Sequence, residues 1–347
     1  MEIKKITFAQ PNRVQFDSVE EELTIVRPTE VVVKNHYSLV SAGTELACLS
    51  GAERWFPLPN TPGYAAVGEI VAHGSSITKV ARGDMVLTHG PHAEYFKIDT
   101  TDRYTGTCIK LPPGLLPELA PLTRMASIAI TSIRVSNVEI GDNVLVTGLG
   151  LVGNLAAQLV ALQGGNVIGV DLSEKRIVCA QACGIAHTVN AKHSDWKAIV
   201  RQIAGRRGIS TYIDATGLSP VIAESSTLIA PYGETVLLGT PRAPYETNIT
   251  EIYSSIHLPG FTTYKGALEW RYPTFTEEFV KHSVQRNSEI LMELAVTGRL
   301  CLGPLLTHKV TPKRAPDIYA GLLAKKDESY LGVIFDWTSE VDNALAS

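Results

Sequence analysis

Residues 143–171 read NVLVTGLGLVGNLAAQLVALQGGNVIGVD and constrain the fold more than any other part of the chain. The apolar run at 143–147 predicts a strand that leads directly into Gly148, Gly150 and Gly153. Helical apolar spacing follows over 151–163, and a second short apolar run at 166–170 ends at Asp171. A strand, a glycine-rich turn, a helix and a second strand in this order are typical of a dinucleotide-binding β-α-β unit.

Each glycine of this fingerprint has its own physical reason. Gly148 allows the tight turn from strand to helix, Gly150 lets the backbone approach a pyrophosphate, and Gly153 lets the helix pack closely on the sheet. We include Leu149 and Val152 in the predicted cofactor loop, since the N–H groups and the dipole at the start of the helix favour a diphosphate. An incidental glycine-rich turn is the alternative interpretation.

Asp171 predicts the choice of cofactor. It lies 23 residues after Gly148, close to the roughly 20 residues expected for the acid that binds a ribose 2′-hydroxyl. A carboxylate there repels a 2′-phosphate, so NAD is favoured over NADP. Arg176 follows five residues later and either flanks the adenosine ribose or is a solvated helix residue.

The 347 residues are long for one domain, and the pattern changes along the chain. We predict a β-rich catalytic domain over 1–117, completed by 268–347, and a Rossmann NAD-binding domain over 118–267 with a doubly wound parallel sheet, an α/β fold. Strands are expected at 4–8, 30–39, 65–72, 84–88 and 93–98, then at 143–147, 166–170, 188–190, 211–215, 234–239 and 331–337. Helices are expected at 117–135, 151–163, 174–183, 194–204 and 220–229, then near 273–286 and 315–325.

Composition excludes several classes of function. The net charge of −4 is spread without runs, which predicts no nucleic-acid or membrane partner. The N-terminus alternates apolar and polar residues, unlike a signal peptide, and no apolar run spans a bilayer. We therefore expect a cytoplasmic protein. The odd number of cysteines without C-x-x-C spacing makes a disulfide framework improbable, and Cys179 and Cys183 share a helix face where small buried side chains are expected more than a metal pair.

Several motifs in chain order resemble the medium-chain dehydrogenase/reductase superfamily, which contains the zinc alcohol dehydrogenases. They are SAGTE at 41–45, PGYAAVGEI at 62–70, GD at 83–84, HAEYF at 92–96, the fingerprint, DATG at 214–217 and LLGT at 237–240. The resemblance runs nearly end to end and implies a GroES-like fold for the β-rich domain.

The departures from the zinc members concern the metal. Where those members carry three catalytic ligands, this chain has Ala42, Tyr64 and, on or near the third position, Arg124. Alanine has no donor atom, arginine stays cationic and a phenol is an uncommon ligand. The cysteine-rich lobe for a structural zinc is absent from the sequence as well. We therefore expect no metal, and the chain resembles the branch that contains bacteriochlorophyllide dehydrogenase.

Without zinc, other groups must stabilise the developing alkoxide. Thr44 matches the hydroxyl that relays the proton in zinc members, or it only caps a turn. Tyr64 exchanges a proton with the substrate, especially if a nearby cation lowers the pKa of its hydroxyl. Alternatively, its ring only fills the space that the metal occupies in zinc members. Arg124 replaces zinc electrostatically or is an exposed helix residue. Glu45 is expected to orient Arg124 or a nearby residue.

Further candidates carry less weight. Thr216, Gly217, Gly239 and Thr240 follow two predicted strands of the parallel sheet, where ligands bind, and are expected to contact the cofactor or to be ordinary turn residues. His36, His89 and His92 are expected to be packed more often than functional. Three further residues lie near the predicted junction of the domains, where substrate or a partner subunit is expected: His257, Tyr264 and Lys265. Lys265 is the foremost candidate among them for a polar contact.

The sequence thus predicts an NAD(H)-dependent, zinc-independent oxidoreductase that interconverts a secondary alcohol and a ketone on a medium-sized substrate such as a sugar or specialised metabolite. Reduction of an activated C=C bond and NAD(H) binding without turnover are the alternatives. The resemblance also implies a homodimer or homotetramer, and residues 261–267 are expected to pair between nucleotide domains.

Overall fold

A computed structural model describes residues 1–324 and 330–339. The chain forms two compact units. The first contains Met1–Met125, Tyr272–Gly298 and, from Leu305 on, the described C-terminal segment. The second contains Ala126–Arg271 and the short segment Arg299–Pro304. Helix α2 (Ala120–Val135) contains the boundary between the units.

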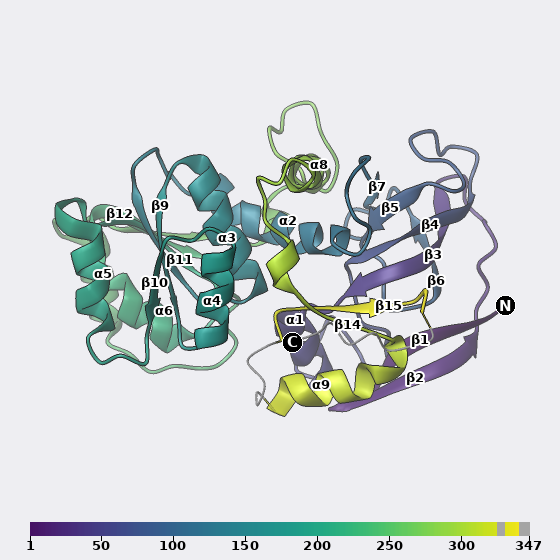
Figure 1. The fold of residues 1–347 in the computed structure, drawn as a ribbon, viewed down its shortest axis with the longest axis horizontal. Coiled ribbons are helices and arrows are strands. Elements are labelled where there is room, and N and C mark those ends of the chain that lie inside the picture. Colours follow the sequence, from purple (N-terminus) through teal and green to yellow (C-terminus); the bar gives the residue numbers. More distant parts are fainter. Residues whose placement is uncertain (325–329, 340–347) are drawn as a thin grey trace. The chain divides into compact units, whose positions relative to one another are not determined.

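The second unit is built on a parallel sheet of six strands, and it confirms the predicted doubly wound fold (Figure 1). From one edge to the other the strands are β10 (His187–Asn190), β9 (Asn166–Asp171), β8 (Asn143–Thr147), β11 (Ile209–Asp214), β12 (Ile229–Leu237) and β13 (Thr263–Gly266). The chain winds outward from β8 in one direction and from β11 in the other. Ligands of such sheets bind where the direction reverses, beyond the carboxyl ends of the strands.

Helices pack on this sheet through apolar faces. Helix α3 contacts β8 and β9, α4 contacts β9 and β10, and α6 contacts β11 and β12. Leu145, Val200 and Tyr212 belong to one buried core. The helices of this unit are α3 (Leu151–Gln163), α4 (Glu174–Ala182), α5 (Trp196–Ala204), α6 (Ser219–Ser226) and α7 (Ile249–His257), with short 3-10 turns at Gly205–Arg207 and Glu269–Arg271.

The first unit is β-rich, as expected. Its larger sheet has the order β14 (Leu306–Val310), β15 (Gly332–Asp336), β3 (Glu30–Leu39), β4 (Ala66–His73), β5 (Met85–Thr88) and β7 (Cys108–Lys110), and β6 (Tyr95–Asp99) pairs with β3. Strands β1 (Glu2–Gln10) and β2 (Arg13–Glu20) form an antiparallel pair. The alternation of buried and exposed side chains in β1 is that of a half-buried strand.

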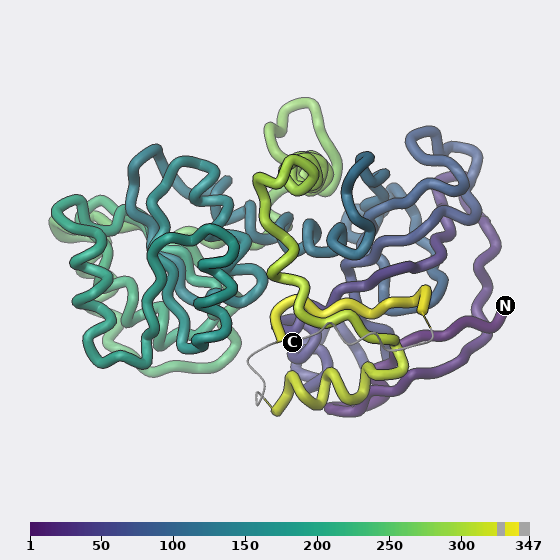
Figure 2. The backbone as a smooth tube through the Cα atoms, in the orientation of Figure 1, coloured from purple at the N-terminus to yellow at the C-terminus, as the bar shows by residue number. Residues whose placement is uncertain are grey.

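The C-terminal segment completes the first unit. Strand β15 pairs antiparallel with β3, and helix α9 (Ala315–Ala324) contacts β2 and α1 (Ala42–Leu49). Figure 2 shows this yellow part of the chain running beside the purple N-terminal strands. Two further 3-10 turns, Gly303–Leu305 and Pro312–Arg314, flank β14.

The helix predicted near 273–286 is wrong. The helix in this region is α8 (Val284–Val296), which begins where the Ser283 side chain accepts a hydrogen bond from the Arg286 N–H at 3.1 Å. Such a cap satisfies one of the N–H groups that the first helical turn leaves without a partner. The helix α1 was not expected, because its motif contains a glycine. Among the described residues, none of the helices has the length and hydropathy of a membrane span.

Candidate active site

The loop after β8 has the tight geometry that its glycines predict. Gly148 has a φ of +84°, and a Cβ at this position would lie 2.8 Å from Thr216 Cγ2. A Cβ at Gly153 would lie 1.7 Å from the Gly148 carbonyl oxygen. Both positions therefore exclude any side chain.

Gly150 differs from its neighbours. A Cβ there would meet nothing closer than Arg176 Nη1 at 3.9 Å, so the space above Gly150 is open. Gly150 is also the N-cap residue of α3 and has no side chain to bind the first N–H groups. These N–H groups and the half-buried Val152 are available to an anionic ligand. The Leu149 side chain is buried and belongs to the core, so only its backbone faces the loop.

Asp171 is held at the end of β9 by backbone donors. Its Oδ2 accepts from the Leu149 N–H at 2.7 Å and its Oδ1 from the Ser173 N–H at 2.8 Å. Arg176 Nη1 lies 3.7 Å from Asp171 Oδ2. The structure therefore brings together Asp171, Arg176 and the open Gly150 at one end of the parallel sheet.

The ends of β11 and β12 are locked together beside this loop. Asp214 accepts from the Thr216 hydroxyl at 2.6 Å and from the Gly217 N–H at 2.9 Å. Gly217 has a φ of +65°, and a Cβ at Gly239 would lie 2.3 Å from the Gly217 nitrogen. Thr240 is exposed. Thr216 thus lies against the fingerprint loop, while the two glycines serve the close approach of two turns.

In the first unit, three hydroxyl groups meet at the start of α1. The hydroxyls of Tyr64 and Ser41 share a hydrogen bond, and the Tyr64 hydroxyl also donates to Thr44 Oγ1 at 3.4 Å. Ser41 is the residue before α1, and Thr44 lies in its first turn. We call Ser41, Thr44 and Tyr64 the hydroxyl cluster. Groups of this kind pass protons along a chain of hydrogen bonds.

Arg124 lies above the ring of Tyr64. Its guanidinium carbon is 5.2 Å from the ring centroid, and the side chain is 1% exposed. The alternative interpretation of Arg124 as an exposed helix residue is therefore wrong, because Arg124 is a buried cation above an aromatic ring. Burial raises the pKa of Tyr64, and this outweighs the lowering by the Ser41 and Thr44 hydroxyls and by Arg124. The cation does not produce the low pKa that the sequence suggested, and Tyr64 is protonated at neutral pH.

Glu45 is the centre of a second, buried network. Its Oε1 accepts from the Ser41 N–H at 2.8 Å, and its Oε2 accepts from His92 Nε2 at 3.2 Å and from the Tyr319 hydroxyl. The Tyr319 pKa is raised well above its usual range by burial first and by the Glu45 charge second, so this phenol is a donor. Glu45 thereby fixes Ser41, the residue that contacts Tyr64.

The network continues behind His92. Because a carboxylate only accepts, His92 Nε2 carries a proton. His92 Nδ1 shares a hydrogen bond with the Ser38 hydroxyl at 2.7 Å, and this hydroxyl accepts from Trp337 Nε1 at 2.9 Å. His92 is thus a packed histidine with fixed hydrogen-bond partners. We call Ser38, Glu45, His92, Tyr319 and Trp337 the Glu45 network.

The other predicted polar candidates belong neither to the hydroxyl cluster nor to the network around Glu45 and His92. His89 Nδ1 donates to the Tyr104 carbonyl at 2.8 Å, and burial holds the His89 pKa well below its ordinary value. Burial also lowers the pKa of His36. Lys265 forms an ion pair with Glu234 at 2.5 Å within the second unit. His257 ends α7, and Tyr264 lies in β13.

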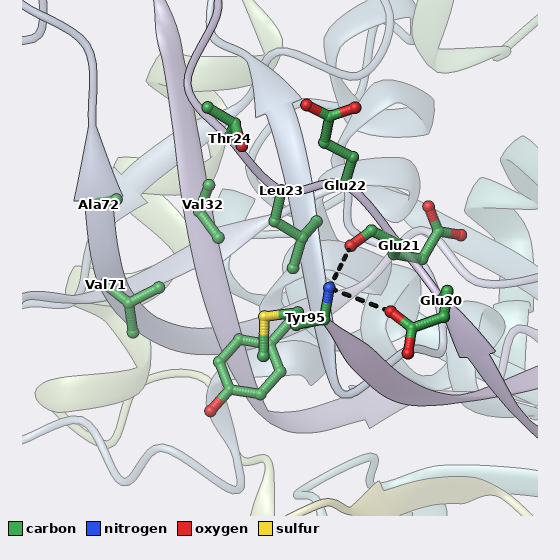
Figure 3. Close-up of a pocket in the computed structure, with 10 residues that line it drawn as sticks. Glu20, Glu21, Glu22, Leu23, Thr24, Val32, Val71, Ala72 and Tyr95 are labelled. Carbon is green, nitrogen blue, oxygen red and sulfur yellow. Dashed lines mark hydrogen bonds and ion pairs between the residues drawn. The ribbon is translucent and has the colours of Figure 1, made fainter.

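A hollow of about 640 Å³ lies apart from these residues (Figure 3). It is lined by apolar side chains of β3 and β4, by Tyr95, by Glu20 at the end of β2 and by the two glutamates that follow it. The N-terminal amine closes one side, 3.3 Å from the Glu20 carboxylate. None of the predicted site residues lines this hollow, so it is not our candidate site.

Sequence reasoning missed most of the Glu45 network and Ser41. The motif SAGTE contains Ser41, but a serine at the start of such a motif carries no distinct signal. Tyr319 and Trp337 lie more than 270 residues from Glu45 in the chain, and only the folding of the C-terminal segment against β3 and α1 brings them close. Among the described residues, no group of three His, Cys, Asp or Glu side chains is arranged to hold a metal.

The sequence was compared with models of known protein families and with known proteins. The model of the alcohol dehydrogenase GroES-like domain matches residues 27–123, and that of the zinc-binding dehydrogenases matches residues 152–281. D-guloside 3-dehydrogenase of Escherichia coli K12 is 27% identical over 276 residues, which are 79% of this chain and 77% of that protein.

Two similar solved structures contain a cofactor. An alcohol dehydrogenase of Escherichia coli CFT073, complexed with NADH, has a TM-score of 0.79 at 18% identity and covers 96% of this chain and 99% of its own. A protein of Sinorhizobium meliloti 1021, described as a zinc-binding dehydrogenase and bound to NADP, has a TM-score of 0.78 at 19% identity with 97% and 99% covered. At this identity the likeness concerns the fold. With both domain models matched in order, the chain belongs to the medium-chain dehydrogenase/reductase superfamily.

Proposed function

We propose that this protein is an NAD(H)-dependent, zinc-independent oxidoreductase that interconverts a secondary alcohol and a ketone. The observation that carries the proposal is the hydroxyl cluster beneath the buried guanidinium of Arg124. It supplies a proton donor and a fixed positive charge, the two services that carbonyl reduction needs besides a hydride.

The residues of the second unit fit a nicotinamide dinucleotide. The open backbone at Gly150 and the first N–H groups of α3 suit the diphosphate, and the Asp171 carboxylate suits a ribose diol. When bound, the nicotinamide supplies or accepts the hydride. Asp171 repels a 2′-phosphate, whereas Arg176 alone would attract one. Because Asp171 is fixed by two backbone donors, we propose NAD.

The residues at the expected zinc position do not fit a metal. Ala42 has no donor atom, and Arg124 places a cation 5.2 Å from the ring of Tyr64. A divalent ion beside this guanidinium would be repelled in an environment that screens charge poorly. Glu45 and His92 are residue types that often bind metals, but here they are hydrogen-bonded to each other at 3.2 Å. We therefore propose a reaction in which zinc takes no part.

In the direction of ketone reduction, the chemistry is simple. The Tyr64 O–H donates its proton to the substrate oxygen as that oxygen becomes negative. A proton taken up from solvent then returns to Tyr64 through the hydroxyl of Ser41 or Thr44, which gives up its own proton and receives the new one. Arg124 stabilises the transient phenolate through its positive charge. Alcohol oxidation runs these proton transfers in reverse. Glu45 keeps Ser41 in place through the backbone N–H.

We propose a polyhydroxylated or similarly sized substrate. D-guloside 3-dehydrogenase, among the similar proteins, is named for a sugar derivative. The resemblance to the branch with bacteriochlorophyllide dehydrogenase also points to a secondary alcohol on a larger molecule. The ketones offered as test substrates should therefore be the oxidised forms of sugars, of polyols and of hydroxyethyl-bearing rings.

A cofactor and substrate panel tests the proposal. Purified protein is mixed with NADH or NADPH and with ketones, quinones and activated enones, while absorbance of the reduced cofactor is followed. We expect turnover of a ketone with NADH preferred. NADPH-selective consumption with enones or quinones would instead establish a C=C reductase. Tight NADH binding without turnover on any substrate would establish a binding protein.

We further propose that the protein is a homo-oligomer that forms through β13. In the described sheet, β13 is an edge strand that pairs with β12 alone. The rings of Tyr232 and Phe261 lie nearby, 5.4 Å apart and exposed. Light scattering after gel filtration will show a dimer or tetramer, and a monomer would contradict the proposal. We keep the cytoplasm as the proposed location, to be tested by fractionation.

A further inference from the structure

Three of the five cysteines meet in the second unit. Cys179 lies in α4, Cys183 follows as its C-cap residue, and Cys301 belongs to the segment Arg299–Pro304. The Cys179 thiol donates to the Pro304 carbonyl at 3.3 Å, and Cys183 Sγ is 3.9 Å from the Cys301 carbonyl oxygen. The Cys183 side chain also interacts with the side chains of both Cys179 and Cys301.

The segment that carries Cys301 is fixed to α3. Gln158 donates through Nε2 to the Cys301 carbonyl at 3.0 Å, and its Oε1 accepts from the Cys301 N–H at 2.7 Å. Such a two-point clamp holds the backbone in one register. The closeness of the three thiols is therefore a feature of the folded unit.

Cys179 and Cys183 differ in exposure and in the acidity of their thiols. Cys179 is partly exposed, and the hydrogen bond from Cys183 lowers the pKa of its thiol. Cys183 is buried, and the same bond and its burial raise the pKa of its thiol. By contrast, burial raises the pKa of the distant Cys108 to about 12. The thiolate is the nucleophile, so Cys179 is the sulfur prepared to react with an oxidant.

We propose that Cys179, Cys183 and Cys301 form a thiol-oxidation site that stores one disulfide between α4 and the segment Arg299–Pro304. The Cys179 thiolate attacks hydrogen peroxide, breaks its O–O bond and becomes a sulfenic acid as hydroxide leaves. The Cys183 sulfur then displaces the sulfenic oxygen as water, which forms a Cys179–Cys183 disulfide. In sum, two thiols and one peroxide give one disulfide and two waters.

The first disulfide is expected to be transient. Side chains four residues apart on a helix have Cβ atoms about 5–6 Å apart, whereas a relaxed disulfide needs about 3.5–4.5 Å. The Cys301 thiolate therefore attacks the Cys183 sulfur and releases Cys179 as a thiolate. The resulting Cys183–Cys301 bond joins two parts of the unit that are far apart in sequence.

Peptide mapping tests this proposal without any enzyme assay, so its outcome is independent of the proposed function. The folded protein is treated with hydrogen peroxide, free thiols are blocked with N-ethylmaleimide, and trypsin products are analysed by mass spectrometry. We expect the peptide 177–192, which contains Cys179 and Cys183, to be linked to the peptide 300–309. Dithiothreitol must separate them.

Variants locate the reacting sulfurs. Cys183→Ser and, separately, Cys301→Ser are expected to abolish the linked peptides, and Cys179→Ser is expected to slow linkage at least about tenfold, since the exposed thiolate is lost. Cys108→Ser is the matched control and leaves linkage unchanged. Circular dichroism confirms that each variant is folded. No linked peptide in the wild type, or linkage that is equally fast in Cys179→Ser, would overturn the proposal.

Discussion

The fingerprint loop and the hydroxyl cluster form their sites in opposite ways. The loop depends on side chains that are missing, because Gly148 and Gly153 have no room for a Cβ and Gly150 leaves its space open. The hydroxyl cluster depends on side chains that are present, namely three hydroxyls under a buried guanidinium. A substitution in the fingerprint loop therefore acts by steric clash. A substitution in the hydroxyl cluster removes a proton donor or a charge and changes the shape of the site little.

The largest effect is expected for Tyr64→Phe, which removes only the hydroxyl. Loss of a general acid costs roughly 10²–10⁴-fold in rate, so we expect kcat for ketone reduction to fall by about that factor. NADH binding, followed by fluorescence titration, should stay within about twofold because the variant keeps the ring. Unchanged turnover would remove Tyr64 from the mechanism.

Arg124→Met tests the positive charge with a side chain of similar length. Removing one electrostatic stabiliser of a transition state costs about 10²–10³-fold in kcat, and we expect the lower end because the guanidinium acts through Tyr64. Arg124→Lys keeps the charge and should recover part of the rate. If Met and Lys lose equal activity, packing and not charge is the role of Arg124.

A pair of glycine variants tests the loop. Gly150→Ala meets no atom within 3.4 Å and should fold with an unchanged melting temperature, yet its methyl group occupies the space of the diphosphate. We expect NADH affinity to fall about tenfold, or about 1.4 kcal/mol. Gly153→Ala collides with the Gly148 carbonyl and should cost at least about 1–3 kcal/mol of stability. Equal stability loss in both variants would contradict the distinction.

Asp171→Ser tests the cofactor choice. It removes the charge that repels a 2′-phosphate and leaves Arg176, 3.7 Å from the present carboxylate, to attract one. We expect the ratio of kcat/KM for NADH over NADPH to fall by about tenfold or more, since one favourable charge interaction is worth about 1 kcal/mol or more near a surface. A wild type that already prefers NADPH would refute the assignment.

The smallest effect concerns pH. Burial raises the pKa of Tyr64 above its usual value of about 10, so the donor form persists at neutral pH and is lost only as the pH rises through that raised pKa. Because burial lowers the pKa of His89, this histidine adds no transition near its ordinary value. We expect kcat/KM for ketone reduction to be level between about pH 7 and 9. A fall centred near pH 8 would mean a different acid.

The two regions also differ in how far the sequence alone could predict them. The fingerprint is local, so strand, glycine spacing and helix α3 could be read directly, and the parallel sheet followed from the β-α alternation. The family resemblance placed Thr44, Tyr64 and Arg124 together, and the structure confirms that Tyr64 contacts both others. The resemblance could not show that burial is the main influence on the pKa of Tyr64.

The parts that could not be predicted depend on long-range packing. Glu45 was expected to orient Arg124 or a neighbour, and its described bonds go to Ser41, His92 and Tyr319. No local pattern links a glutamate in α1 with a tyrosine in α9. The misplaced helix near 273–286 has a local cause, because Ser283 caps a helix that starts at Val284, eleven residues after Pro273.

The central claim is that the hydroxyl cluster and Arg124 do the work of a metal. The most direct measurement is ketone reduction by protein that has been dialysed against 1,10-phenanthroline, with its zinc content measured by mass spectrometry on the same sample. We expect full turnover by zinc-depleted protein and no gain when zinc is added back. Loss of turnover on chelation, restored by zinc, would contradict it.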